Sequence, residues 1–136
     1  MRSNAEIARS MAIKFWGHPD HQKKIADGIW LFSTASHGGM IVDTNVRTEL
    51  RSYNSPVTSR QYLIPSEQHF AAFEEDCMAA IVEWVYASDI YTHKFRSMYV
   101  SDLSDEDFFQ ERLKLIHKSL ERWNPDVLEK WPNPNY

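Results

Sequence analysis

The sequence predicts an α+β fold, in which a small antiparallel sheet formed by one hairpin packs against three or four helices. Two observations carry this prediction. In the first half, two short β-branched and aromatic runs flank a pair of adjacent glycines, as in a hairpin. In the second half, apolar residues recur at intervals of three and four, as on amphipathic helices. A length of 136 residues suits one core, so residues 1–136 are expected to form a single domain.

The first helix is expected over residues 4–15. Ser3 and Glu6 have the spacing of a capping box, in which each side chain bonds a free backbone N–H of the other. An apolar stripe follows at intervals of four, made of Ile7, Met11 and Phe15. Gly17 should end the helix. The polar, turn-rich segment from there to Gly28 is interpreted as a surface connection without regular structure.

The hairpin is expected to pair residues 28–34 with residues 40–42. Both runs are rich in aromatic and β-branched residues, which are favoured in strands. The segment 35–39 between them ends in Gly38 and Gly39, and two glycines supply the positive φ of a tight reversal.

Two features are expected between the hairpin and the second half of the chain. A short helix, capped by Asp43 or Thr44, would carry Val46 and Leu50 on its apolar side. Residues 51–65 contain Asn, Ser and Pro residues that are typical of turns, so we expect a loop there.

A long helical pattern begins at Ser66, directly after Pro65. Its apolar residues recur at intervals of three, four, four and three, namely Phe70, Phe73, Cys77, Ile81 and Trp84. Small apolar residues widen this face, so we expect the segment to be the central helix, buried on more than one side. Residues 62–64, just before it, suit a short third strand.

Two further helices are expected near the C-terminal end. Ser104 should cap the first of them, and the acids Asp105, Glu106 and Asp107 suit its positive end. The apolar positions of that helix recur at four, three, four and three, namely Phe109, Leu113, Ile116, Leu120 and Trp123. Asn124 and Pro125 then start a last helix, with an apolar side made of Val127, Leu128 and Trp131.

Charge is distributed unevenly along the chain. The net charge of −4 comes from +3 in residues 1–60 and −7 in residues 61–136. An acidic half is a poor match to direct nucleic-acid binding, which needs clustered Lys and Arg. It suits docking on a basic protein, including one that itself binds nucleic acid. The simpler interpretation is that the acidic surface keeps the protein soluble.

The composition excludes several classes of protein. One cysteine permits no internal disulfide and no zinc site of the kind that two to four thiolates form. No apolar run approaches the roughly 18 residues of a membrane-spanning helix, and the N-terminus lacks the apolar centre of a signal peptide. We therefore expect no membrane association and a place in the cytoplasm.

Two clusters are candidates for a ligand site. His37 lies on the hairpin turn, where Ser36 and the backbone N–H groups around Gly38 and Gly39 suit an anion. Glu74 and Asp76, from the predicted central helix, would complete the site. The alternative is a turn that only needs its glycines, since the segment lacks the length and the Lys of a phosphate-binding loop.

Cys77 and the neighbouring acids permit two further interpretations. Cys77 with His37 as its base would be a nucleophile, but its place in the apolar stripe favours an inert core residue. Glu74, Glu75 and Asp76 could hold a metal with His37 and His69. Successive helical acids point about 100° apart, however, which favours a solvated face. We expect no catalytic residue, no metal and no cofactor.

The two clusters and the end of the last long helix carry a resemblance. Ser33-Thr34-Ala35-Ser36-His37-Gly38-Gly39, then Glu74-Glu75-Asp76-Cys77, then Trp123-Asn124-Pro125-Asp126 occur in this order. With Gly28 before them, they resemble an uncharacterised domain family carried by bacteriophages and other mobile elements, over residues 16–131. No activity transfers with the resemblance, but it implies an accessory protein that acts on a host enzyme or defence system.

These observations predict a binding protein that inhibits or sequesters a host protein, such as an immune effector that binds nucleic acid. Asp105, Glu106 and Asp107 would belong to its docking surface. The alternative is a protein that sequesters or hydrolyses a nucleotide signal at a site around His37 and residues 74–77. A structural role in a virion is a third class. The sequence leaves the oligomeric state open.

Overall fold

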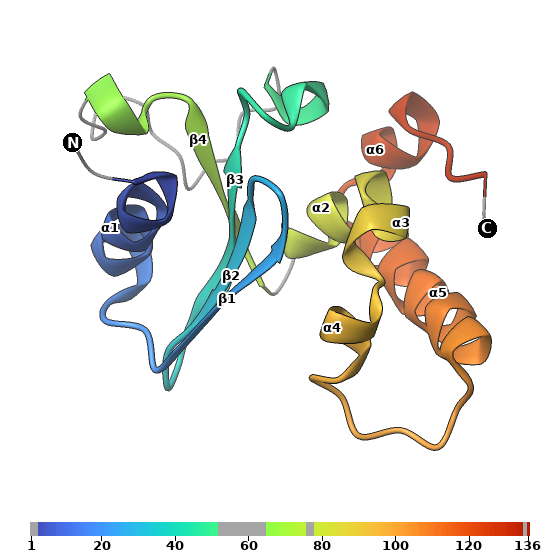
Figure 1. The fold of residues 1–136 in the computed structure, drawn as a ribbon. Coiled ribbons are helices and arrows are strands. Elements are labelled where there is room, and N and C mark those ends of the chain that lie inside the picture. The colour runs from blue at the N-terminus through green and yellow to red at the C-terminus, as the bar shows by residue number, and fades with distance from the viewer. Residues whose placement is uncertain (1–2, 52–64, 76–77, 135) are drawn as a thin grey trace. The chain divides into compact units, whose positions relative to one another are not determined.

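The computed structural model describes residues 3–51, 65–75, 78–134 and 136 (Figure 1). They form a four-stranded antiparallel sheet and a set of helices, so the α+β prediction is confirmed. The chain divides into two compact units, Met1–Met78 and Ala79–Tyr136. The expectation of a single domain stays a prediction. Within the described ranges, no helix has the length and apolar character needed to cross a membrane.

Helix α1 (Asn4–Trp16) opens the first unit where the sequence predicted it. The Ser3 hydroxyl accepts the Glu6 N–H at 3.2 Å, and the Glu6 carboxylate accepts the Ser3 N–H at 3.3 Å. The predicted capping box is therefore confirmed. Gly17 ends the helix with a φ of 90°. The buried face consists of Ile7, Ala8, Met11, Ala12 and Trp16.

The prediction of an irregular connection between Gly17 and Gly28 is wrong, because strand β1 (His21–Ala26) lies there. This strand is at the edge of the sheet, paired on one side with β2 (Ile29–Ser33). Half of its side chains are exposed and only Ile25 is buried. Because an edge strand can leave its side chains in solvent, β1 lacks the alternation of apolar and polar residues that identifies a strand. Its polar sequence therefore resembles that of a loop.

The predicted hairpin is confirmed as the antiparallel pair of β2 and β3 (Gly38–Asp43). The role assigned to its glycines is wrong. Gly38 and Gly39 lie inside β3, and neither has a positive φ. Positive φ occurs instead at Gly28, at 76°, where the chain turns from β1 into β2.

The prediction of one long helix from Ser66 is also wrong. Strand β4 (Phe70–Glu74) occupies its first half, and helix α2 (Ala79–Val85) begins only afterwards. All residues from Phe70 to Phe73 are buried, so the strand shows a continuous apolar run without alternation. Phe70 and Phe73 are three residues apart with two alanines between them, and both this interval and the alanines are typical of a helix. Cys77 lies outside the described residues.

The core of the first unit lies between α1 and one face of the sheet, whose strand order is β1-β2-β3-β4 (Figure 1). Because side chains alternate along a strand, Trp30 and Phe32 of β2 reach the same face as Ile41 of β3. The buried cluster comprises Ile7, Ala8, Met11, Ala12, Trp16, Trp30, Phe32, Ile41, Phe70 and Ala72, with Phe15 packed against it.

Two short 3-10 helices complete the described part of this unit. Thr48–Leu50 lies where a short helix was predicted, with Leu50 buried and Val46 exposed. Pro65–Glu67 precedes β4. The strand predicted at residues 62–64 lies outside the described residues.

The regular elements in the described part of the second unit are all helices. Its helices are α2, α3 (Ala87–Ile90), α4 (His93–Arg96), α5 (Asp105–Trp123) and α6 (Pro125–Lys130). The two helices predicted for the C-terminal end are confirmed as α5 and α6. Ser104 caps α5 by accepting the Asp107 N–H at 3.2 Å. The buried stripe is shifted at both ends, since Phe108 is buried in place of Phe109, and Trp123 is 56% exposed.

Candidate functional site

The hairpin turn that carries His37 satisfies its own backbone groups. The Thr34 hydroxyl accepts the His37 N–H at 2.9 Å and donates to the His37 carbonyl at 2.9 Å. The Thr34 N–H donates to the same carbonyl at 2.7 Å. The side chains of Ser36 and His37 are exposed. This turn therefore presents two polar side chains to solvent, but the backbone N–H groups of Thr34 and His37 are already hydrogen-bonded within the turn.

Gly38 and Gly39 are positions of close backbone approach. A Cβ atom on Gly39 would lie 2.2 Å from the Phe73 carbonyl oxygen and 2.9 Å from Cζ2 of Trp16. A Cβ atom on Gly38 would lie 2.5 Å from the Phe32 carbonyl oxygen. Both distances to oxygen are shorter than a real side chain tolerates. Packing inside the sheet thus accounts for both glycines.

The structure places two of the predicted acids, Glu74 and Glu75, beside the glycines, and the Glu75 N–H donates to the Gly38 carbonyl at 3.0 Å. Glu74 is half-buried and pairs with Gly39 across β3 and β4. Asp76 lies outside the described residues. His69 precedes β4 and Glu74 ends it, so His69 and His37 lie at opposite ends of the strand. Among the described residues, no group of three or more His, Cys, Asp or Glu side chains is arranged to hold a metal ion.

The acids that were assigned to a docking surface lie exposed in the first turn of α5. Oδ1 of Asp105 is 3.7 Å from Nε of Arg96. Glu106 and Asp107 complete the acidic turn, where negative charge also stabilises the positive end of the helix.

A loop next to these acids is held rigidly, and sequence reasoning missed it. Arg96 donates from Nη1 to the carbonyl of Tyr99 at 3.1 Å, and from Nη2 to the carbonyls of Ser101 and Leu103, both at 2.9 Å. In this loop the side chain of Val100 is fully exposed, and that of Leu103 is 42% exposed. Two aliphatic side chains are therefore presented to solvent by a loop tied at three carbonyls. The only hint in the sequence is a stretch without helical period.

No Lys or Arg occurs in residues 97–111, which contain five acids. They are Asp102, Asp105, Glu106, Asp107 and Glu111, and all five are exposed. The next cation along the chain is Arg112, which is turned inward against Glu83. The loop and the first turns of α5 therefore form a locally acidic surface, called here the acidic loop surface and made of residues 97–107.

Glu83 and Arg112 form a buried ion pair between α2 and α5. Nε of Arg112 is 2.9 Å from Oε1 of Glu83 and Nη2 is 3.1 Å from Oε2, while the Tyr91 hydroxyl donates to Oε1 at 3.2 Å. Burial lowers the pKa of Arg112, but the charge and hydrogen bonds of Glu83 outweigh it and hold that pKa above its usual range. Burial and then the charge of Glu83 raise the pKa of Tyr91. These groups hold the helices together.

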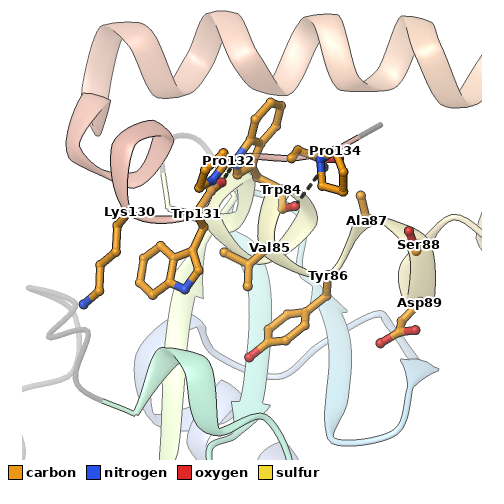
Figure 2. Close-up of a pocket in the computed structure, with 11 residues that line it drawn as sticks. Trp84, Val85, Tyr86, Ala87, Ser88, Asp89, Lys130, Trp131, Pro132 and Pro134 are labelled. Carbon is orange, nitrogen blue, oxygen red and sulfur yellow. Dashed lines mark hydrogen bonds between the residues drawn. The ribbon is translucent and has the colours of Figure 1, made fainter. Parts of the chain in front are cut away.

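The second unit also contains a pocket of about 370 Å³ (Figure 2). One wall is formed by α2, α3 and the residues that join them. The other is formed by Lys130, the last residue of α6, and the segment that follows it. The pocket is lined by Trp84, Val85, Tyr86, Ala87, Ser88, Asp89, Lys130, Trp131, Pro132, Asn133 and Pro134. Sequence reasoning placed Trp131 on the apolar side of the last helix and missed the pocket, because its walls lie far apart in the chain.

Comparison with known proteins gives one match. A family model described as "Domain of unknown function (DUF7007)" matches residues 9–135. No curated protein matches the chain, and no solved structure matches it. The match begins within α1 and spans the four strands and the helices of the second unit.

Proposed function

The chain belongs to the DUF7007 family of domains of unknown function, and we propose that it is a binding protein that inhibits or sequesters a basic partner protein through the acidic loop surface. In the setting implied by the resemblance to phage-borne domains, the partner is a host protein such as an immune effector that binds nucleic acid. The protein would act by direct contact with its partner and not by catalysis.

One observation carries this proposal. Val100 and Leu103 are exposed on a loop that Arg96 fixes at three carbonyls. Exposed aliphatic residues on a rigid loop lose little conformational entropy when a partner covers them. An apolar centre within a polar rim is the usual arrangement of a protein interface.

The charge around these aliphatic residues favours a basic partner. Asp102, Glu106 and Asp107 are exposed beside them, and residues 97–111 contain no cation. Opposite charge accelerates encounter with a basic protein and disfavours acidic ones. The same surface repels nucleic acid, so a partner that binds nucleic acid would use its own basic groups to hold this chain.

The test uses paired variants that alter exposed residues only. Val100→Ser with Leu103→Ser removes the aliphatic contacts, and Leu115→Ser is the matched control because Leu115 is also exposed, at 59%, on α5. Asp102→Asn with Glu106→Gln removes two charges from the surface. The same substitutions at two exposed acids of α6, Asp126→Asn with Glu129→Gln, are their control.

The measurement is quantitative capture from a bacterial host lysate, followed by the dissociation constant with the purified partner. We expect a basic protein whose affinity falls as salt rises. We expect the aliphatic variant to bind at least about tenfold more weakly, the charge variant to bind more weakly with a reduced salt dependence, and both controls to bind normally. If no protein is captured, or the aliphatic and charge variants bind as tightly as their controls, the proposal is wrong.

A further inference from the structure

The pocket of the second unit has the size and lining of a small-molecule site. Its volume of about 370 Å³ lies in the range of roughly 300–1,000 Å³ that is typical of such sites. Aromatic and proline residues make up five of its eleven lining residues, and four others are polar or charged. None of the residues that line this pocket belongs to the acidic loop surface, so a ligand could bind there whether or not the proposed function is correct.

The pocket is preformed, because hydrogen bonds tie its two walls together. Nε1–H of Trp84 in α2 donates to the Trp131 carbonyl at 2.7 Å, and Nδ2–H of Asn133 donates to the Trp84 carbonyl at 3.2 Å (Figure 2). The Tyr136 ring stacks on His117 of α5, with centroids 4.6 Å apart, and fixes the end of the same segment. A ligand would therefore meet walls that are already in place.

Charged groups lie at opposite ends of the pocket. Figure 2 shows Lys130 at one end and Asp89 at the other, with Trp131, Val85 and Tyr86 between them. Nζ of Lys130 lies 4.7 Å from the centre of the Trp131 ring. The half-buried Trp131 thus offers an apolar ring that has a positive charge over one face.

We propose that this pocket binds a small planar aromatic anion. The ring of the ligand stacks on Trp131, and its anionic group contacts the Lys130 ammonium. A cationic ligand would be repelled by the ammonium that lies against the Trp131 ring. An aliphatic ligand would use neither that charge nor a stacking contact on the indole ring. A nucleoside monophosphate and an aromatic carboxylate share this chemistry.

The test follows the indole N–H signals of the five tryptophans by NMR in the intact chain. The probes are AMP, indole-3-acetate, adenosine and inorganic phosphate. We expect AMP, indole-3-acetate or both to shift the Trp131 and Trp84 signals saturably. Binding of AMP alone identifies a nucleotide site, and binding of indole-3-acetate alone identifies a carboxylate site. Binding of both identifies a site that recognises an aromatic ring with a negative charge, whatever the anionic group. Adenosine should bind about tenfold more weakly than AMP, because it lacks the charged contact.

Variants with a matched control decide whether the pocket is responsible. Lys130→Ala should weaken binding about tenfold, and Trp131→Ala should abolish it, as read from the Trp84 signal. The control pair is Arg122→Ala and Trp123→Ala, since Arg122 lies 4.9 Å from the Trp123 ring centre outside the pocket. These control variants should bind normally. The proposal is overturned if neither anion shifts the Trp131 signal at millimolar concentration, or if the pocket variants bind as the controls do.

Discussion

Gly39 shows how a single residue position is decided by its neighbours in space. The position lies in β3, one of the two inner strands of the sheet. The backbone of Phe73 and the indole ring of Trp16 approach it closely. Trp16 is 8% exposed, and its Nε1–H has no hydrogen-bond partner among the described residues. The indole is thus placed there by packing against the glycine, since an unbonded buried donor is itself unfavourable.

We expect Gly39→Ala to lower the free energy of unfolding by more than about 2 kcal/mol, because the added methyl group would meet backbone atoms that cannot move aside. Gly17→Ala is the comparison. Gly17 has open space around it, but its φ of 90° and ψ of −178° are essentially restricted to glycine, so backbone strain of about 1–3 kcal/mol is expected without a clash. Urea unfolding measures both. A loss below about 1 kcal/mol for Gly39→Ala would contradict the packing role of Gly39.

At the scale of elements, α2 and α5 are joined by a buried ion pair with a phenol as third member. Glu83 is 4% exposed, and both of its carboxylate oxygens accept from Arg112. Pairs of this kind stabilise little in net terms, but removal of one partner leaves a buried charge uncompensated. The Tyr91 hydroxyl adds a donor to the same carboxylate and brings the residue after α3 into the contact.

The raised pKa of Tyr91 predicts how stability changes at high pH. The unfolded chain releases this proton near pH 10, whereas burial and Glu83 make the folded chain retain it. The resulting stabilisation is fully present below that pH and is lost as the pH rises toward the folded pKa. We expect the free energy of unfolding to fall above pH 10, with this residue contributing up to about 1.4 kcal/mol per pH unit.

Urea unfolding of the wild-type chain and of Tyr91→Phe, at a series of pH values, checks this prediction. The variant should be less stable by about 1 kcal/mol at neutral pH, because it lacks the hydroxyl, and its stability should fall less steeply above pH 10. Tyr136→Phe, at a ring that is 56% exposed, should retain the wild-type slope. A wild-type slope in Tyr91→Phe would refute the assignment.

At the scale of the whole molecule, the chain combines a unit containing the sheet with a helical one. The second unit spans residues 79–136, and a unit of this size buries only a modest core. Its charge is also distinct, with ten acids against seven Lys and Arg residues. The prediction of a single domain requires that the second unit unfold together with the first.

We expect one cooperative unfolding transition for both units. Leu113→Ala, at a fully buried position of α5, should cost about 2–5 kcal/mol. Fluorine NMR of the chain labelled with fluorotryptophan reports on Trp16 and Trp30 in the first unit and on Trp84, Trp123 and Trp131 in the second. All five signals should shift to the same lower urea midpoint. Trp16 and Trp30 signals that keep the wild-type midpoint would show two independent domains.

The sequence by itself determined the features that depend on neighbours along the chain. The capping box at Ser3, the cap at Ser104 and the helices α1, α5 and α6 all follow from contacts within a few residues. The hairpin of β2 and β3 is equally local. The exposed acids at the start of α5 were found for the same reason, since cap and charge occur together.

Only the tertiary structure decided the features whose partners are distant in sequence. An edge strand with exposed side chains and a strand buried along its length lack the alternation that identifies strands, so the predictions for β1 and β4 were wrong. The glycines of β3 depend on Trp16 and Phe73. The pocket beside Trp131 needs α2 and the segment after α6, and the loop held by Arg96 depends on hydrogen bonds to three carbonyls, which no periodic pattern records.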